Sequence, residues 1–217
     1  ELSRLFKSKD YLSKENKMLK EQLDESYLNN FVISREKSFF YDHSSLNKII
    51  NGNKFIESYS LAKLKSINPN IFNCCDKHRM YIEIIQNTNK DIKEGAVFNE
   101  TGIIGQVVNN KSFYEVMLLT DTKSSIPLTN SKGDFYCNAS GSGASDYITC
   151  SYSQLVWLDN HELGEKFFSS GLGGIYPKGI EIGNLESIKI VDTSTTLLTI
   201  KLISNPLHSN LFGVIKL

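Results

Sequence analysis

The first thirty residues of the chain carry apolar side chains in a heptad pattern, with mostly charged and polar residues between them. Two sets of positions, three residues apart, repeat every seven residues, as the a and d positions of a coiled coil do. The pattern predicts a helical stalk over residues 1–55 that dimerises through its N-terminal part. The residues expected to face the dimer partner are Leu2, Leu5, Leu12, Asn16, Leu19 and Leu23.

Asn16 bears on which of two interpretations of this helix is favoured. A helix that packs on its own domain usually shows a wide apolar face, whereas the apolar stripe here is narrow. A single Asn at an a position is typical of two-stranded coiled coils, because the two amides can hydrogen bond across the dimer. These features favour a homodimer or a higher assembly. A helix that packs against its own domain is the alternative.

The pattern changes after "NGN" at 51–53, which ends the helical region. The rest of the chain has short β-branched or aromatic segments, separated by clusters of Gly, Asn, Asp and Ser. Without helical patterns between them, such segments predict a sandwich or barrels. The expected fold is mainly β with an N-terminal α-helix, a coiled-coil stalk followed by two small β-barrels. The predicted strands are 59–67, 81–86, 105–108, 114–119, 135–139, 147–152, 187–191, 197–203 and 212–217.

One hairpin is marked by the stretch "FYCNASGSGASDYITCSY". Its small residues centre between Gly143 and Ala144, and Cys137 and Cys150 are equally distant from that centre. We therefore expect the two cysteines to face each other on neighbouring strands, with Cα atoms about 4.5 to 5.5 Å apart. Whether they are oxidised depends on the compartment.

The stretch "SSGLGGIYPKGIEIG" is dense in glycine, and it contains Gly171, Gly173, Gly174, Pro177 and Gly179. It lacks the dinucleotide-binding fingerprint, because a tyrosine stands where the third glycine is required and no helical pattern follows. Glycines allow positive φ, and a Pro followed by Lys-Gly suits a tight turn. We interpret the stretch as a structural loop through which the chain passes from one barrel to the other.

Composition excludes several partners. Lys plus Arg and Asp plus Glu number 24 each, so no net positive field favours nucleic acid. The sequence contains no run of about 18 apolar residues, as a membrane span would require. A membrane is therefore expected as a partner only through a span that is absent from this sequence.

The sequence shows no convincing pattern of catalytic or metal-binding residues. The stretch "DNHELGE" lacks the second His of a zincin helix and suggests a solvated turn, and "CCDKH" has no second pair of zinc ligands. A P-loop and a nucleophile elbow are also missing. His78 and Ser170 could stand in two barrels of a serine protease, but the order His, Asp, Ser is common by chance in such a sequence. We predict no catalytic residues, no metal and no cofactor.

Three segments, preceded by the coiled coil, resemble the periplasmic part of the MreC family of rod-shape-determining proteins. The resemblance covers nearly the whole chain. Ser169 stands where the family usually has Thr, "HELGEKFFSSG" is a loose version of the family pattern, and the cysteines match no motif of the family. The segments are "MYIEIIQNTNKDIKEGAVFNETGIIGQVV", "YEVMLLTDTKSSIPL" and "SSGLGGIYPKGIEIGNLESI", and their most specific parts are 102–107, 118–121 and 170–179.

The resemblance implies a non-enzymatic scaffold of the bacterial cell-elongation machinery. Such a scaffold determines cell shape by binding and organising, and also by activating, a peptidoglycan-synthesising penicillin-binding protein. It also implies a second barrel, over residues 102–168, inserted into a first barrel made from 59–101 and 169–217. The expected location is the periplasmic side of the inner membrane, with a single-pass anchor upstream of Glu1. The implied partners are a second copy, the elongation-specific penicillin-binding transpeptidase, MreD and, indirectly, MreB.

Exposed aromatic residues of the second barrel are the candidate partner contacts, because binding hot spots concentrate in aromatic anchors. The candidates are Phe135, Tyr136, Tyr152 and Trp157. Alternation directs about half of any strand inward, so some of these side chains are expected in the core.

Two other classes of protein share parts of this pattern. A periplasmic adaptor of an efflux or secretion system also joins a coil to β-domains, but its coil is a hairpin between two halves of a lipoyl-like domain. Here a single helix precedes all the strands. A double-barrel serine protease would need a catalytic triad that the sequence does not reveal.

Overall fold

The computed structural model describes residues 11, 14–18, 46, 56, 59–68, 71, 76–86, 92–110, 113–153 and 161–216. The chain divides into two compact units, Glu1–Phe40 and Tyr41–Leu217. In the first unit, residues 14–18 are helical and exposed, and they include Asn16. The other five residues predicted to face the dimer partner lie outside the described residues. The predicted dimer contact therefore stays a prediction.

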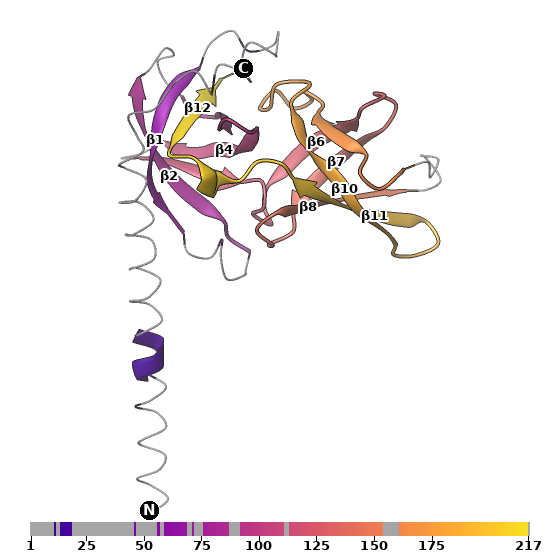
Figure 1. Cartoon of the computed structure of the whole chain (residues 1–217), viewed down its shortest axis with the longest axis horizontal. Helices are drawn as coiled ribbons and strands as arrows, with labels where there is room; N and C mark the ends of the chain where they lie inside the picture. The colour runs from indigo at the N-terminus through magenta and orange to yellow at the C-terminus, as the bar shows by residue number, and fades with distance from the viewer. Residues whose placement is uncertain are drawn as a thin grey trace, which may run out of the picture. The chain divides into compact units, whose positions relative to one another are not determined.

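The first barrel has six strands, all paired antiparallel (Figure 1). Around the barrel the order is β1-β12-β3-β4-β5-β2. The last strand of the chain pairs with the first, Ser60 opposite Val214, and so closes the barrel. The strands are β1 (Ser60–Ile67), β2 (Arg79–Gln86), β3 (Gly95–Phe98), β4 (Ile103–Asn110), β5 (Tyr114–Leu118) and β12 (Leu211–Ile215).

The second barrel also has six antiparallel strands, in the order β10-β11-β8-β7-β6-β9 (Figure 1). A short 3₁₀ helix, η1 (Pro206–His208), follows β11 and leads back to the first barrel. The strands are β6 (Ser125–Asn130), β7 (Tyr136–Gly141), β8 (Tyr147–Ser153), β9 (Lys166–Ser169), β10 (Glu181–Ile190) and β11 (Thr195–Leu202).

The second barrel is inserted between β5 and β12 of the first, but the predicted boundaries at 102 and 168 are wrong. β4 and β5 belong to the first barrel, because they pair with β3 and β2. β10 and β11 belong to the second barrel, because they pair with β9 and β8. The chain passes between barrels at 119–124 and at 203–210. The glycine-rich loop therefore joins two strands of one barrel, contrary to the prediction that it joins the two barrels.

β11 illustrates why these segments form strands. Thr196, Leu198 and Ile200 alternate with more exposed residues, and all three are fully buried. The period of two places one face of the strand in the barrel interior, where apolar burial stabilises the fold. Every segment predicted as a strand overlaps one in the structure. β3, β6 and β9 were not predicted.

Cys137 and Cys150 lie on the neighbouring strands β7 and β8, as predicted, and they form a disulfide. The predicted register is wrong, because Ala139 and not Cys137 lies opposite Cys150. The Cα atoms are 6.2 Å apart, which is beyond the expected range for directly opposite residues. The turn is centred one residue further along the chain than the small residues suggest.

Candidate functional site

The segments that carry the family resemblance meet at the junction between the two barrels. The segment 102–107 lies at the start of β4, and 118–121 lies at the end of β5. The loop 170–179 connects β9 to β10 in the second barrel. Hydrogen bonds from this loop and from the two crossing segments, 119–124 and 203–210, hold the junction together.

Ser169 organises the glycine-rich loop from its base. Its buried hydroxyl donates to the Pro177 carbonyl and accepts from the Ile180 amide at 3.0 Å. The Ser169 backbone pairs with the Ile180 carbonyl and the Gly179 amide, each at 2.8 Å. One side chain therefore fixes both ends of the loop. The loop's positive-φ glycines, at +69° to +82°, are Gly171, Gly173, Gly174 and Gly179.

Tyr176 connects this loop to the other barrel. Its ring is fully buried, and its hydroxyl donates to Gln106 Oε1 at 2.9 Å. Gln106 lies on β4 of the first barrel. Burial raises the pKa of the Tyr176 hydroxyl, so the donor keeps its proton well into the alkaline range. In the sequence this tyrosine stands where a dinucleotide-binding loop has a glycine, and an aromatic residue within a glycine-rich loop is the one feature that indicates a buried anchor.

The segment 203–210, by which the chain returns from the second barrel, also contacts the first barrel. The Ser204 hydroxyl donates to the Ile103 carbonyl, and the Asn99 amide donates to the Asn205 carbonyl at 2.9 Å. The Asn99 side-chain oxygen accepts from the Thr101 amide at 3.0 Å and so holds the turn before β4. These bonds anchor the segment by which the chain re-enters the first barrel.

Asp121 holds the opposite crossing, where the chain leaves β5. This carboxylate is fully buried, and its Oδ2 lies 3.0 Å from Arg79 Nε and accepts from the His78 amide at 3.0 Å. Its Oδ1 accepts from the Lys123 amide at 2.9 Å. A Cβ added to Gly141 would lie 2.0 Å from the Asp121 carbonyl oxygen, so β7 approaches this turn closely. The cluster fixes the start of β6 against the end of the first barrel.

His78 and Ser170, the candidates for a protease, have separate partners. His78 Nδ1 lies 2.7 Å from Thr120 Oγ1, and its ring is fully buried. Burial lowers the pKa of His78, although nearby Asp121 opposes this shift, so the neutral ring is favoured. The Ser170 hydroxyl accepts from the Leu172 amide at 3.3 Å within the loop. The structure does not bring the two side chains together in any hydrogen bond between described residues.

The candidate partner contacts divide between core and surface. Phe135 and Tyr152 are only 3% and 7% exposed, and their ring centroids lie 5.1 Å apart. This burial contradicts a contact role for both, because a partner cannot reach them in the folded barrel. Tyr136 points outward and is 41% exposed. Trp157 lies outside the described residues.

The predicted solvated turn is present, since residues 162–164 are exposed, but the His161 side chain is not part of its solvated surface. That side chain is 5% exposed, and its ring centroid lies 4.4 Å from that of Phe135. Its Nδ1 is 2.7 Å from Glu165 Oε2, and Glu165 Oε1 accepts from the Asn130 amide at 3.1 Å. The imidazole thus belongs to the aromatic core of the second barrel, which includes Phe167.

The part of the chain that the structure describes offers few groups for other kinds of site. No three His, Cys, Asp or Glu side chains there are placed to hold a metal ion. Of the described helices, none combines the length and apolarity needed to cross a membrane.

Two closed antiparallel barrels, one inserted into the other and joined by hydrogen bonds, define a class of double-barrel proteins. The chain belongs to the MreC family, since the model of the rod shape-determining protein MreC, barrel core, matches residues 71–216. It is 28% identical over 181 residues to the cell shape-determining protein MreC of Haemophilus influenzae, covering 80% of this chain and 47% of that protein. The chain spans about half the length of the curated relatives from H. influenzae and Escherichia coli.

Solved structures show the same fold. The crystal structure of MreC from Pseudomonas aeruginosa has a TM-score of 0.62 at 22% identity, with 73% of this chain and 99% of that chain covered. MreC in a complex with the penicillin-binding protein PBP2 from Helicobacter pylori has a TM-score of 0.54 at 16% identity, with 73% and 97% covered. These likenesses support the nested barrel architecture.

Proposed function

We propose that this chain is the barrel part of a non-enzymatic scaffold that determines cell shape by binding and organising a penicillin-binding protein of peptidoglycan synthesis. Membership of the MreC family carries this proposal. The H. pylori relative of the same fold is known in a complex with PBP2, which supports a penicillin-binding transpeptidase as the partner. Activation of that enzyme by the scaffold is part of the proposal.

The junction suits a scaffold because it limits movement between the barrels. Tyr176 places a hydrogen bond across it, and Ser204 and Asn99 anchor the returning segment to the first barrel. Two barrels held in this way present surfaces in a constant orientation, which lowers the entropy cost of binding both at once. Organising a partner needs such preorganised surfaces and no reacting groups.

The remaining parts of the proposal concern the assembly in the cell envelope. The chain acts on the periplasmic side of the inner membrane, anchored by a single span and dimerised through its stalk. MreD is a further partner, and MreB is an indirect one. The disulfide supports an oxidising compartment, where such bonds persist.

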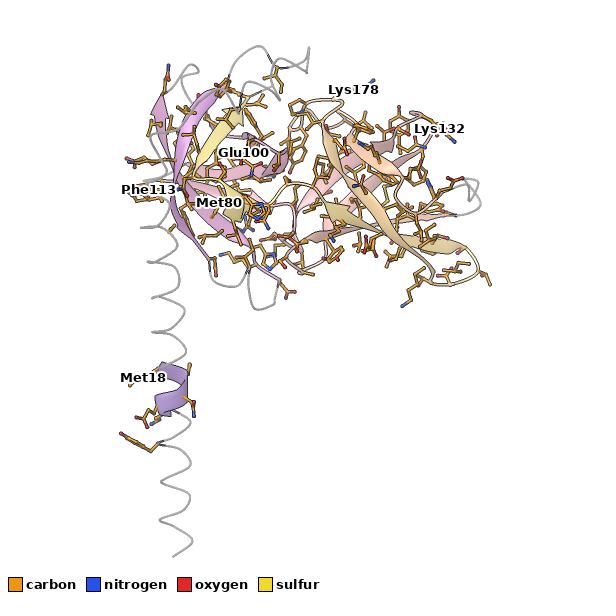
Figure 2. All side chains as sticks on the ribbon, in the orientation of Figure 1. Met18, Met80, Glu100, Phe113, Lys132 and Lys178 are labelled. Atoms are coloured by element: carbon orange, nitrogen blue, oxygen red, sulfur yellow. A yellow bond between two sulfur atoms is a disulfide. The ribbon has the colours of Figure 1, made fainter. Side chains whose placement is uncertain are left out.

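A binding measurement tests the proposal directly. The full chain is titrated with the periplasmic part of the elongation transpeptidase in a calorimeter, and saturable binding at micromolar concentrations is expected. Tyr136→Ala removes the exposed aromatic candidate of the second barrel, and Phe113→Ala is the matched control on the first barrel. Figure 2 shows Phe113 beside the first barrel. We expect Tyr136→Ala to weaken binding by about 1 kcal/mol or more, as hot-spot truncations do, and the control to leave it unchanged.

Hydrolysis of a broad peptide library by the full chain is measured alongside. Absence of binding at high micromolar concentration would overturn the scaffold proposal. Hydrolysis that Ser170→Ala abolishes would replace it with a protease.

A further inference from the structure

β10 extends well beyond the strand that covers one of its edges. β9 pairs with β10 only between Glu181 and Asn184, and the chain just before β9 pairs with Leu185. From Ser187 to Ile190, β10 pairs with β11 on its other side. Figure 1 shows β10 and β11 running together to a turn away from the rest of the barrel. Along Ser187–Ile190, no described residue pairs with the remaining edge, which we call the open edge.

The turn at the end of this hairpin determines which backbone groups lie on the open edge. The Val191 amide donates to the Thr195 carbonyl at 2.9 Å. Backbone groups alternate between the two edges of a strand, so those of Lys189 also point to β11. Those of Ile188 and Ile190 consequently point outward, each offering one donor and one acceptor.

The side chains at the open edge are apolar. Ile188 and Ile190 are 41% and 67% exposed. In the register of the sheet they lie opposite Leu198 and Thr196, which are fully buried. Residues directly opposite each other share a face of the sheet. The face that lines the barrel interior thus continues along β10, past the end of β9, where no described strand covers it.

Lys189 projects from the other face of the sheet and carries the charge of this edge. It lies opposite Leu197, and it forms no ion pair with a described residue. This lysine argues against pairing between two copies of the chain. A two-fold pairing that used both Ile188 and Ile190 would place Lys189 directly opposite its own copy, and like charges there are unfavourable. Lysines on edge strands commonly oppose such self-association.

We propose that the open edge binds an extended segment of a partner protein as an added antiparallel strand. The segment has an acidic residue between two β-branched apolar residues. The apolar residues lie opposite Ile188 and Ile190 and cover the exposed face, while the acidic residue lies opposite Lys189. Strand addition gives affinity through the backbone and selectivity through alternate side chains. The proposal concerns this surface and is independent of the transpeptidase as partner.

Amide hydrogen exchange, measured by NMR on the full chain, tests the proposal at single residues. The added ligand is an acetylated pentapeptide, Thr-Val-Glu-Val-Thr, and the control ligand replaces its Glu by Lys. We expect the first peptide at millimolar concentration to slow exchange of the Ile188 and Ile190 amides. The Lys189 amide, which already pairs with β11, should be unaffected. The Lys-containing peptide should bind about fivefold more weakly, in keeping with cross-strand charge pairs.

The variant Lys189→Glu should reverse the preference between the two peptides. Lys132→Glu makes the same change on an exposed turn of the second barrel and should leave the preference intact (Figure 2). The proposal is overturned if neither peptide slows exchange at Ile188 and Ile190, or if both act equally on both variants. It is also overturned if these amides become protected without peptide as the protein concentration rises, since that result indicates pairing between two copies.

Discussion

The Tyr176 hydroxyl provides the most direct test of the junction. Tyr176→Phe removes only the donor to Gln106 Oε1 and keeps the buried ring. Losing one partner of a buried hydrogen bond costs about 1 to 3 kcal/mol. Gln106 is only half-buried, so water can reach part of its side chain, and we expect a loss near the lower limit, about 1 kcal/mol. For a unit of this size, the melting temperature should fall by about 2 to 4 °C.

Thermal unfolding of the full chain, followed by circular dichroism, measures this loss. Tyr136→Phe is the matched control, because it makes the same chemical change on an exposed ring. Replacing both partners, in Tyr176→Phe with Gln106→Leu, should recover part of the stability, since no buried acceptor is then left unpaired. If Tyr176→Phe unfolds at the same temperature as the exposed control, the hydroxyl does not stabilise the junction.

Alkaline pH provides an independent test of the same group. Burial raises the pKa of Tyr176 above its ordinary value of 10, so the folded state retains a proton that the unfolded state loses. The stabilisation is therefore complete below pH 10 and decreases as the pH rises further. Tyr176→Phe should lose less stability than the unaltered chain above pH 10. Equal losses in the two proteins would refute the assignment.

Four further changes address other parts of the molecule. Asp121→Asn removes the nearer of the two carboxylates beside the buried Arg79 and leaves only Glu115, at 4.0 Å, so it should cost about 3 kcal/mol in a urea titration. Ser169→Ala should cost about 2 kcal/mol, whereas Ser169→Thr keeps the hydroxyl and most of the stability. Because burial lowers the pKa of His78, stability should fall as the pH drops below 6.5, and His78→Gln should lessen that dependence in melts at successive pH values. Leu12→Asp with Leu19→Asp should give monomers with folded barrels, and a dimeric mass in light scattering would show that the stalk does not hold the dimer.

The alternation of apolar residues predicts strands well when it extends over six or more residues, about the length of a typical strand. β11 and β8 are examples, since each alternates buried and more exposed positions over most of its length. β3 and β9 have only four residues each, too few to show a period. β6 contains Pro127, and a proline within a segment argues against a paired strand. These three strands were missed for those reasons.

The boundaries between the barrels depend on pairing, which alternation does not encode. β1 and β12 are widely separated in the sequence but pair with each other, with Ser60 opposite Val214. A pattern of period two states that a segment is a strand but not which strand lies beside it. The same limit explains the cysteine hairpin, where small residues indicate a turn and leave the register open. Tyr176 was missed because its partner, Gln106, lies 70 residues away.

Several residues in or near the segments that carry the family resemblance are tightly enclosed. A Cβ at Gly105 would lie 2.1 Å from the Met117 carbonyl oxygen, and one at Gly141 would lie 2.0 Å from that of Asp121. Asp121 is enclosed by the backbone amides of His78 and Lys123, and Tyr176 closes the junction from the loop. These residues are buried, so they fix how the barrels are joined and cannot contact a partner. Selectivity for partners must therefore reside in exposed positions, and the open edge at Ile188 and Ile190 is where the described surface combines unpaired backbone with apolar side chains.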